Sequence, residues 1–118
     1  MKNTRPADIY LRFLQLAEVL RGLPSLPPLD PLEERILALV ARAGHDRDRL
    51  SVRDMMGQGE LGAPATIHTR LKSMREKGWI LLSDTEDTRR KQVELTQAAL
   101  VHFDKLSNCI LKAAEGST

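Results

Sequence analysis

A mainly helical α+β domain with one β-hairpin is predicted by three features of this 118-residue sequence. Apolar residues recur at helical spacing in four segments. Proline, glycine and capping residues separate these segments. Two short apolar stretches flank a charged turn, which is typical of a hairpin. The length suits a single domain, and a composition of 42% hydrophobic and 29% charged residues is that of a globular protein.

The first predicted helix covers residues 5–21 and is apolar on more than one face. So wide an apolar surface fits two structures equally well: a helix buried in the core of one domain, or a helix packed against a second copy of the chain. We assign residues 1–22 to this helix as a dimerisation element. The prolines that follow cannot continue a helix, so residues 23–31 are predicted to form a stiff connection.

The second helix has strong start signals, with Asp30 as N-cap, Pro31 at the first position and Glu33 at the third. Gly44 is the expected stop. After a polar loop, Leu50 is expected in a short strand. Ser51 then caps a brief helix that runs to Met56 and is predicted to bury Val52, Met55 and Met56. Residues 57–63 form a glycine-rich turn.

A third long helix is predicted from Pro64 to Lys77, with Gly78 at its end. Ile67, Leu71 and Met74 form its buried side. Residues 79–82 are predicted as a strand, 83–89 as a charged turn and 90–95 as the returning strand. Thr96 caps the last helix, which is predicted over 97–114 within a C-terminal segment 97–118. The apolar stripe of this helix is made by Ala99, Phe103, Leu106, Ile110 and Ala113.

Net charge is only +2, but the basic excess is local: residues 65–91 hold seven basic and four acidic side chains. By itself such a run is more often a solvated helix face and a basic turn than a binding site. The position of the basic run in the predicted fold makes a binding site the better interpretation. A short helix, a turn and a longer helix followed at once by a hairpin predict a winged helix-turn-helix over 32–96, and the basic excess falls on its second helix and its wing.

This arrangement predicts contact with duplex DNA, because a recognition helix enters the major groove and basic side chains at a wing reach the minor groove or its phosphates. An aromatic content of 3% argues against single-strand binding by base stacking. The predicted DNA-binding residues are Thr66, His68, Thr69, Arg70, Lys72, Ser73, Arg75, Asp87, Arg89, Arg90 and Lys91.

Residues 31–113 resemble the DNA-binding half of the MarR family of bacterial transcription regulators. The similarity lies in Lys77-Gly78-Trp79-Ile80, in Asp87-Thr88-Arg89 and in Val93-Glu94-Leu95-Thr96, which are in register with one another. We expect a homodimer that binds a roughly palindromic operator, most simply as a repressor. The lack of a membrane-length apolar run and of an apolar signal segment predicts a cytoplasmic protein. The resemblance implies that Arg89 is the minor-groove arginine and that Asp87 orients it through a charge-assisted pair.

The sequence departs from the family in two places. The 57–63 turn is longer and richer in glycine, and the chain ends soon after Thr96, where many members continue into a further dimerisation helix. The first and last helices would therefore supply the dimer between them. The predicted interface residues are Ile9, Tyr10, Phe13, Leu14, Ala17, Phe103, Leu106 and Ile110.

Other functions have weaker support. A winged helix that binds only proteins is the main alternative, although it would not need a basic face. The pattern Gly57-x-Gly59-x-x-Gly62 fits a dinucleotide loop, but charged residues precede it where a buried strand should lie, so no enzyme is predicted. No metal site or cofactor is expected from three distant histidines, and Cys109 is expected to be a buried, inert thiol. A small-molecule effector is compatible with the sequence but not indicated by it, and no membrane segment is expected.

Overall fold

The computed structural model describes residues 6–21, 26–46, 50–84 and 90–115. The chain forms two compact units: one combines residues 1–25 with 100–118, and the other contains residues 26–99. The second unit carries the predicted winged helix-turn-helix. Each unit is considered separately below.

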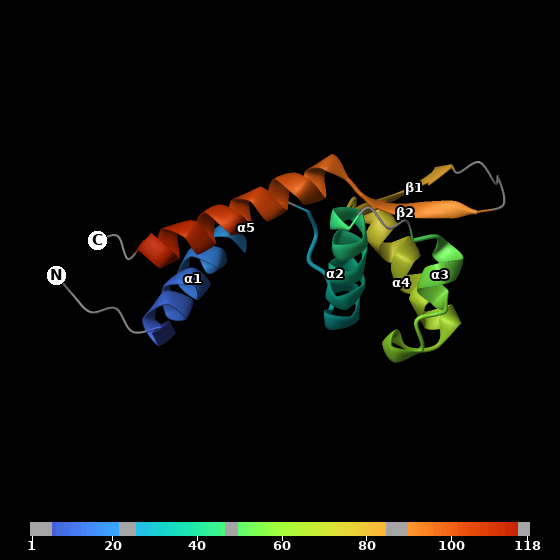
Figure 1. The fold of residues 1–118 in the computed structure, drawn as a ribbon, viewed down its shortest axis with the longest axis horizontal. Helices are drawn as coiled ribbons and strands as arrows, with labels where there is room; N and C mark the ends of the chain where they lie inside the picture. Colours follow the sequence, from blue (N-terminus) through green and yellow to red (C-terminus); the bar gives the residue numbers. More distant parts are fainter. Residues whose placement is uncertain (1–5, 22–25, 47–49, 85–89, 116–118) are drawn as a thin grey trace. The chain divides into compact units, whose positions relative to one another are not determined.

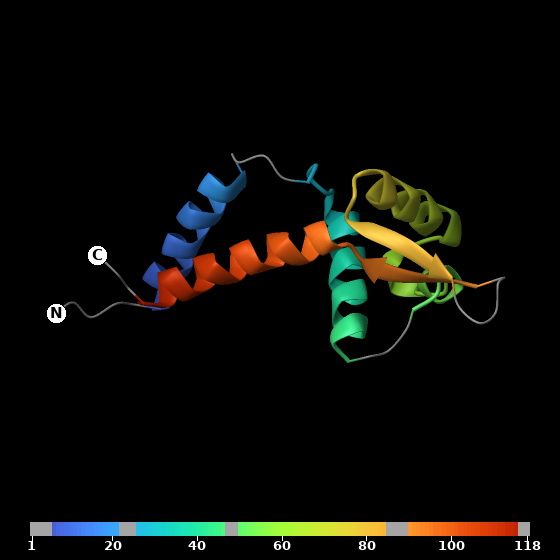
Figure 2. The ribbon, with the colours of Figure 1, turned by 90° about the horizontal axis from the view of Figure 1, so that it is seen from above.

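The 26–99 unit is built from helices packed against one hairpin (Figure 1). Its elements are α2 (Pro31–His45), α3 (Val52–Met56), the 3-10 turn η1 (Gly59–Leu61), α4 (Pro64–Glu76), β1 (Ile80–Asp84), β2 (Lys91–Leu95) and the start of α5 (Gln97–Glu115). Strand β2 packs against α2 and α3, and β1 packs against α4 (Figure 2). The order and packing are those of a winged helix-turn-helix, so the predicted fold class is confirmed.

The hairpin is antiparallel, and its register pairs Ile80 with Leu95 and Asp84 with Lys91. A third segment joins it through a single bridge between Ser51 and Gln92, and the Val93 N–H donates to the Leu50 carbonyl at 2.8 Å. The short strand expected at Leu50 is thus reduced to one bridge that ties the start of α3 to the wing.

The first strand was predicted one residue too early. Trp79 precedes β1, which starts at Ile80 and continues to Asp84 rather than ending at Leu82. The Trp79 backbone N–H donates to the Met74 carbonyl at 3.0 Å and so closes the end of α4. Its indole N–H donates to the Pro27 carbonyl at 2.7 Å, which anchors the proline-rich connection. Gly78 adopts φ +90° in the turn between α4 and β1, a conformation that glycine tolerates. A Cβ added at this position would lie 3.2 Å from the Leu26 side chain.

The core of this unit lies where α2, α3, α4 and β1 meet. Its largest fully buried apolar side chains are Ile36, Met55, Ile67, Met74 and Ile80. The prediction that α3 also buries Val52 and Met56 was wrong, because both are only half-buried and line a hollow described below.

All three capping predictions in this unit are confirmed, and Thr96 Oγ1 accepts the Ala99 N–H at 3.0 Å at the start of α5. The Asp30 side chain accepts from the Glu33 N–H and the Glu33 carboxylate accepts from the Asp30 N–H, which completes a capping box. Ser51 forms the same reciprocal box with Asp54 at α3. Gly44 is not the stop of α2 as expected: the helix continues through His45, and Asp46 is its C-cap.

The other unit pairs α1 (Pro6–Arg21) with most of α5. Leu20 and Ala113 are buried, yet many large apolar side chains of the two helices are exposed. Those on α1 are Tyr10, Leu11, Leu14 and Val19, and those on α5 are Leu100, Val101, Ile110 and Leu111. No helix within the described ranges is long and apolar enough to cross a membrane.

Candidate nucleic-acid interface

Helix α4 presents three distinct sides to its surroundings. Ile67, Leu71 and Met74 face the core. A second side faces α2 and a third faces α3 and the hairpin, as the contacts below show. Ala65, Thr66 and Thr69 remain exposed near the start of the helix, where a recognition helix would meet base edges.

The side toward α2 is held by two ion pairs. Arg70 Nε lies 2.8 Å from Asp30 Oδ2, and Lys77 Nζ lies 2.8 Å from Glu33 Oε1. Ser73 also hydrogen-bonds Glu33. The capping box that starts α2 therefore anchors α4 at two points, seven residues apart on that helix.

Glu33 is the centre of this anchor, since only 1% of it is exposed. Burial alone would raise the pKa of Glu33, but hydrogen bonds from Lys77, the Asp30 backbone and Ser73, with the charge of Lys77, lower it below its ordinary value. The carboxylate thus stays ionised at neutral pH and keeps Lys77 in place.

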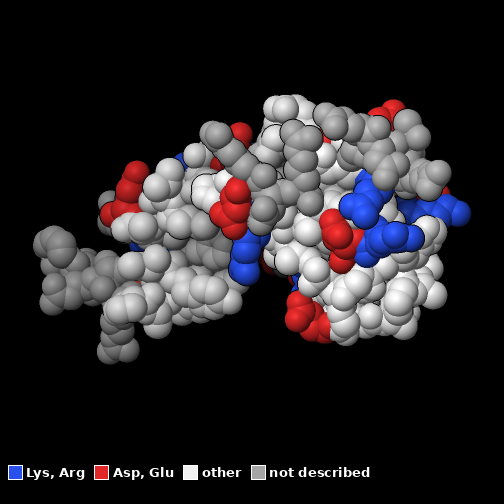
Figure 3. All heavy atoms as spheres, turned by 45° about the vertical axis from the view of Figure 1, so that its right-hand side comes forward, with Lys and Arg blue, Asp and Glu red and all other residues white. Residues whose placement is uncertain are grey.

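The third side of α4 borders a hollow of about 610 Å³ enclosed by α3, α4 and the two strands. Figure 3 shows Lys and Arg side chains gathered on the side of the molecule that carries the hairpin. Among the described residues, those lining the hollow include six basic or potentially basic side chains and no carboxylate. They are Ser51, Val52, Arg53, Met56, His68, Leu71, Lys72, Arg75, Leu82, Arg90 and Lys91.

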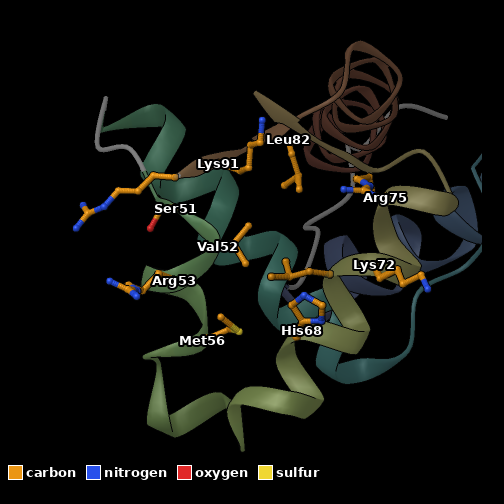
Figure 4. A pocket seen from close by; sticks show the side chains of 11 residues that line it. Ser51, Val52, Arg53, Met56, His68, Lys72, Arg75, Leu82 and Lys91 are labelled. Atoms are coloured by element: carbon orange, nitrogen blue, oxygen red, sulfur yellow. The ribbon is translucent and has the colours of Figure 1, made fainter. Parts of the chain in front are cut away.

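Apolar and charged groups occupy different parts of this hollow. Val52, Met56 and Leu82 point into it, as does the imidazole of His68 (Figure 4). The charged ends of Arg53 and Lys72 point outward at the rim. The result is an aliphatic interior surrounded by positive charge, which is suited to attract anions.

The predicted wing residues are only partly within the described ranges. Asp87 and Arg89 lie outside them. Arg90 is exposed and near enough to Asp54 to help lower the pKa of that carboxyl group, which is held down first by the Ser51 backbone N–H. Lys91 pairs with Asp84 across the hairpin. Both cations therefore face the same hollow as α4, although each also has an acidic neighbour.

The predicted DNA-binding residues within the described ranges fall into three groups. His68, Lys72, Arg75, Arg90 and Lys91 come together around the hollow. Thr66 and Thr69 are exposed on the adjoining part of α4, where Thr69 Oγ1 donates to the Ala65 carbonyl. Arg70 and Ser73 instead face α2. Helical periodicity could not separate the last group, because it does not show which neighbour covers each flank.

Sequence reasoning missed Arg53 and the apolar interior. Arg53 belongs to α3, outside the 65–91 segment that the charge count emphasised. Val52 and Met56 were assigned to the core because they are apolar. The signal that could have found them is the brevity of α3, which leaves one of its sides open toward the wing.

The glycine pattern that suggested a dinucleotide loop has the wrong context. Gly57 is the C-cap of α3, so a helix and not a strand precedes the motif, and Gly59 begins η1. In the part of the chain that the structure describes, no three His, Cys, Asp or Glu side chains are grouped to hold a metal.

Comparison with known proteins gives matches in structure only. No family model matches the chain, and no curated protein matches it significantly in sequence. MepR of Staphylococcus aureus bound to ethidium bromide superimposes with a TM-score of 0.64 at 17% identity, over 93% of this chain and 72% of that one. The fold is that of the MarR-like regulators.

Two further structures agree with this assignment of the fold. A mutant of MepR bound to an oligodeoxyribonucleotide gives a TM-score of 0.61 at 17% identity, covering 93% of this chain and 73% of that one. A MarR-like transcriptional regulator from Thermotoga maritima gives 0.57 at 14% identity, covering 98% and 84%. The MarR-like fold that the wing motifs predicted is therefore confirmed over most of the chain.

Proposed function

We propose that this protein is a sequence-specific, duplex DNA-binding transcriptional regulator that acts as a homodimer on a palindromic operator, as a repressor. The observation that carries the proposal is the basic rim that α3, α4 and the hairpin share on a winged helix. A MepR variant of the same fold is bound to an oligodeoxyribonucleotide, which supports the same use of the fold here.

In this proposal, α4 enters the major groove with its exposed N-terminal half. Thr66 and Thr69 approach base edges, since small polar side chains allow close contact. His68, Lys72 and Arg75 contact the phosphates beside the groove, with Arg53 added from α3. Arg70 and Ser73 act through α2 by fixing the orientation of α4.

The wing supplies the contact to the next groove. Arg89 reaches the minor groove, and Asp87 orients it, as the resemblance of Asp87-Thr88-Arg89 implies. Arg90 and Lys91 neutralise the phosphates between the two grooves, because they lie on the hollow shared with α4.

The homodimer is supported by the apolar surface of α1 and α5. Tyr10, Leu14 and Ile110, all predicted interface residues, are 60%, 42% and 54% exposed in the single chain. Ile9, Phe13, Ala17, Phe103 and Leu106 are half-buried. Large exposed apolar side chains on two neighbouring elements are typical of a protein interface, and a second copy of the same chain is the simplest partner. Two copies would place their α4 helices in successive major grooves about 34–36 Å apart.

The test is fluorescence anisotropy of the protein with duplex DNA across a salt series. We expect Lys72→Ala and Arg75→Ala each to weaken binding and to lower the salt slope by about one unit, because each removes one phosphate contact. Arg42→Ala is the matched control: Arg42 is an exposed cation in the last turn of α2, outside the hollow.

Two results would contradict the proposal. A folded dimer that binds no duplex even at low salt would favour a winged helix that binds only proteins. Binding that Arg42→Ala weakens as much as Lys72→Ala does would show a diffuse charge effect rather than an interface on α4.

A further inference from the structure

We propose that Thr69 determines base specificity at one position of each half-site, where its methyl group, beside that of Ala65, contacts the C5-methyl group of a thymine. This contact rests on the proposed function, because it requires that α4 lies in the major groove. Thymine is the only base of DNA that carries a methyl group there.

The outward side of α4 is small and uncharged near its start. Ala65, Thr66 and Thr69 are exposed, whereas Ile67 is buried in the core and the imidazole of His68 points into the hollow (Figure 4). Because residues four apart share one side of a helix, Ala65 and Thr69 are neighbours on this outward side. Side chains of this size let a base edge come close to the helix.

The neighbouring residue Arg70 fixes which way this side faces. Arg70 Nε lies 2.8 Å from Asp30 Oδ2, which holds Arg70 toward α2. Thr69 directly precedes Arg70, so its side chain projects about 100° away from that contact. Thr69 is exposed in that direction. The ion pair with α2 therefore keeps Thr69 outward, and Arg70 is not available to a base that Thr69 contacts.

The Thr69 hydroxyl is already engaged within the helix. Its Oγ1 donates to the Ala65 carbonyl at 3.0 Å, four residues earlier. The single hydroxyl proton is thus not free for the acceptor atoms of a purine. What Thr69 still presents to a base edge is its methyl group and the lone pairs of its oxygen.

The residue types at the start of α4 disfavour the other bases. Guanine and adenine are bound best by Arg, Lys, Asn or Gln, and cytosine by a carboxylate. Residues 64–69 contain none of these, and the only carboxylate of α4 is Glu76 in its last turn. An oxygen acceptor alone would not separate adenine from cytosine, since both present an amino group. The two methyl groups of Ala65 and Thr69 select thymine.

The test begins with duplexes selected from a random library by the full-length protein. Each thymine of the selected half-site is then replaced by uracil, which removes only the C5-methyl group and keeps the base pair. We expect one position at which uracil weakens binding about fourfold per half-site in fluorescence anisotropy, the effect of losing one buried methyl group. Replacement of thymines outside the half-sites is the control and should change nothing.

A modified cytosine tests the methyl group independently of thymine. At the same position, 5-methylcytosine paired with guanine should bind about fourfold tighter than unmodified cytosine, because it carries the same C5-methyl group. Equal binding of the two cytosine duplexes would overturn the methyl contact.

Two variants assign the contact to one group of Thr69. Thr69→Ser removes the methyl group and keeps the hydroxyl, so it should bind the thymine and uracil duplexes equally. Thr69→Val keeps a methyl group and removes the hydroxyl, so it should retain the preference of about fourfold. Arg42→Ala, an exposed cation on α2, should retain it as well. Thermal melts check folding, which exposed Thr69 should not affect.

The outcomes separate this contact from the proposed function. A preference for thymine that persists in Thr69→Ser or disappears in folded Thr69→Val would overturn the role of the methyl group, as would a selected site at which uracil has no effect. In each of these cases DNA is still bound, and the proposed function stands. If no duplex is selected or bound even at low salt, both fail together.

Discussion

At the scale of single residues, Glu33 has the most connected role in the 26–99 unit. Its carboxylate accepts the Asp30 N–H at 2.9 Å and the Lys77 ammonium at 2.8 Å, so it starts one helix and anchors the end of another. Lys77 also donates to the Pro28 carbonyl at 2.9 Å, which brings the proline-rich connection into the same network. Glu33 and Lys77 therefore join the proline-rich connection and the start of α2 to the end of α4, 44 residues further along the chain.

This network predicts how stability depends on pH. The folded pKa of Glu33 lies below its ordinary value of 4.5, so its stabilisation is complete above that value and is lost as pH falls through the folded pKa. Glu33→Gln should lower the free energy of unfolding at pH 7 by about 1–3 kcal/mol and flatten its decline in acid. Urea denaturation between pH 7 and pH 3 measures this. Glu34→Gln, an exposed neighbour, should change little, and an acid profile identical to wild type in Glu33→Gln would contradict the assignment.

A second residue-scale prediction concerns the wing. Arg89→Ala should weaken duplex binding about tenfold or more without lowering the melting temperature, because a wing-tip arginine acts on DNA and not on the core. Anisotropy and a thermal melt on the same sample separate these effects. A variant that unfolds, or one that binds as wild type does, would show that Arg89 only stabilises the turn.

At the scale of elements, the position of α4 is set by its partners on both sides. The α2 capping box holds it through Arg70 and Lys77, while its opposite side remains open toward the hollow. The Arg70–Asp30 pair is partly solvent-exposed and adds little to stability, whereas Glu33 is buried in its pair with Lys77. Both pairs also fix the orientation of α4, which in the proposed function decides which of its side chains meet DNA.

A double-mutant cycle tests this positioning role. If Arg70 acts through Asp30, Arg70→Ala should weaken DNA binding in the wild type but have little further effect in Asp30→Ala. If Arg70 contacts DNA itself, the two losses should add. Stability should fall by only about 0.2–1 kcal/mol in Arg70→Ala, because the two side chains of the pair are 40% and 38% exposed. It should fall by about 0.5–2 kcal/mol in Asp30→Ala, which also removes the N-cap of α2. Anisotropy and urea denaturation of all four proteins provide the cycle.

At the scale of the whole molecule, the remaining exposed apolar surface lies largely on α1 and α5. These helices belong to a compact unit of their own, separate from the winged helix. Their exposed Tyr, Leu, Val and Ile side chains would be an aggregation liability in a monomer. A dimer that buries them also doubles the number of DNA contacts, which is how a small domain can gain operator affinity.

The dimer prediction is tested at Ile110. Ile110→Glu should shift the protein toward monomer in analytical ultracentrifugation and lower affinity for a two-half-site duplex more than for a single half-site. Ala38→Glu is the control, because Ala38 is exposed on α2 outside these helices. A monomeric wild type, or a fully dimeric Ile110→Glu protein, would show that this surface has another role.

Much of the fold could be predicted from the sequence because its signals are local. Capping residues show where helices begin and end, because they act within one turn of the chain. They are Asp30, Pro31 and Glu33 at α2, Ser51 at α3, and Pro64 and Gly78 at α4. The spacing of Ile67, Leu71 and Met74 likewise identified the buried side of α4. The resemblance to MarR-like regulators was carried by other local motifs, chiefly Lys77-Gly78-Trp79-Ile80 and Val93-Glu94-Leu95-Thr96.

What only the tertiary structure decided is the partner of each side chain. The Trp79 backbone N–H bonds the Met74 carbonyl while its indole N–H bonds the Pro27 carbonyl, and Arg70 turned to α2 because Asp30 lies there. Val52 and Met56 stayed half-exposed because the hairpin and α4 leave a hollow beside α3. Most of these depend on contacts between residues far apart in the chain, and periodicity and capping record only near neighbours.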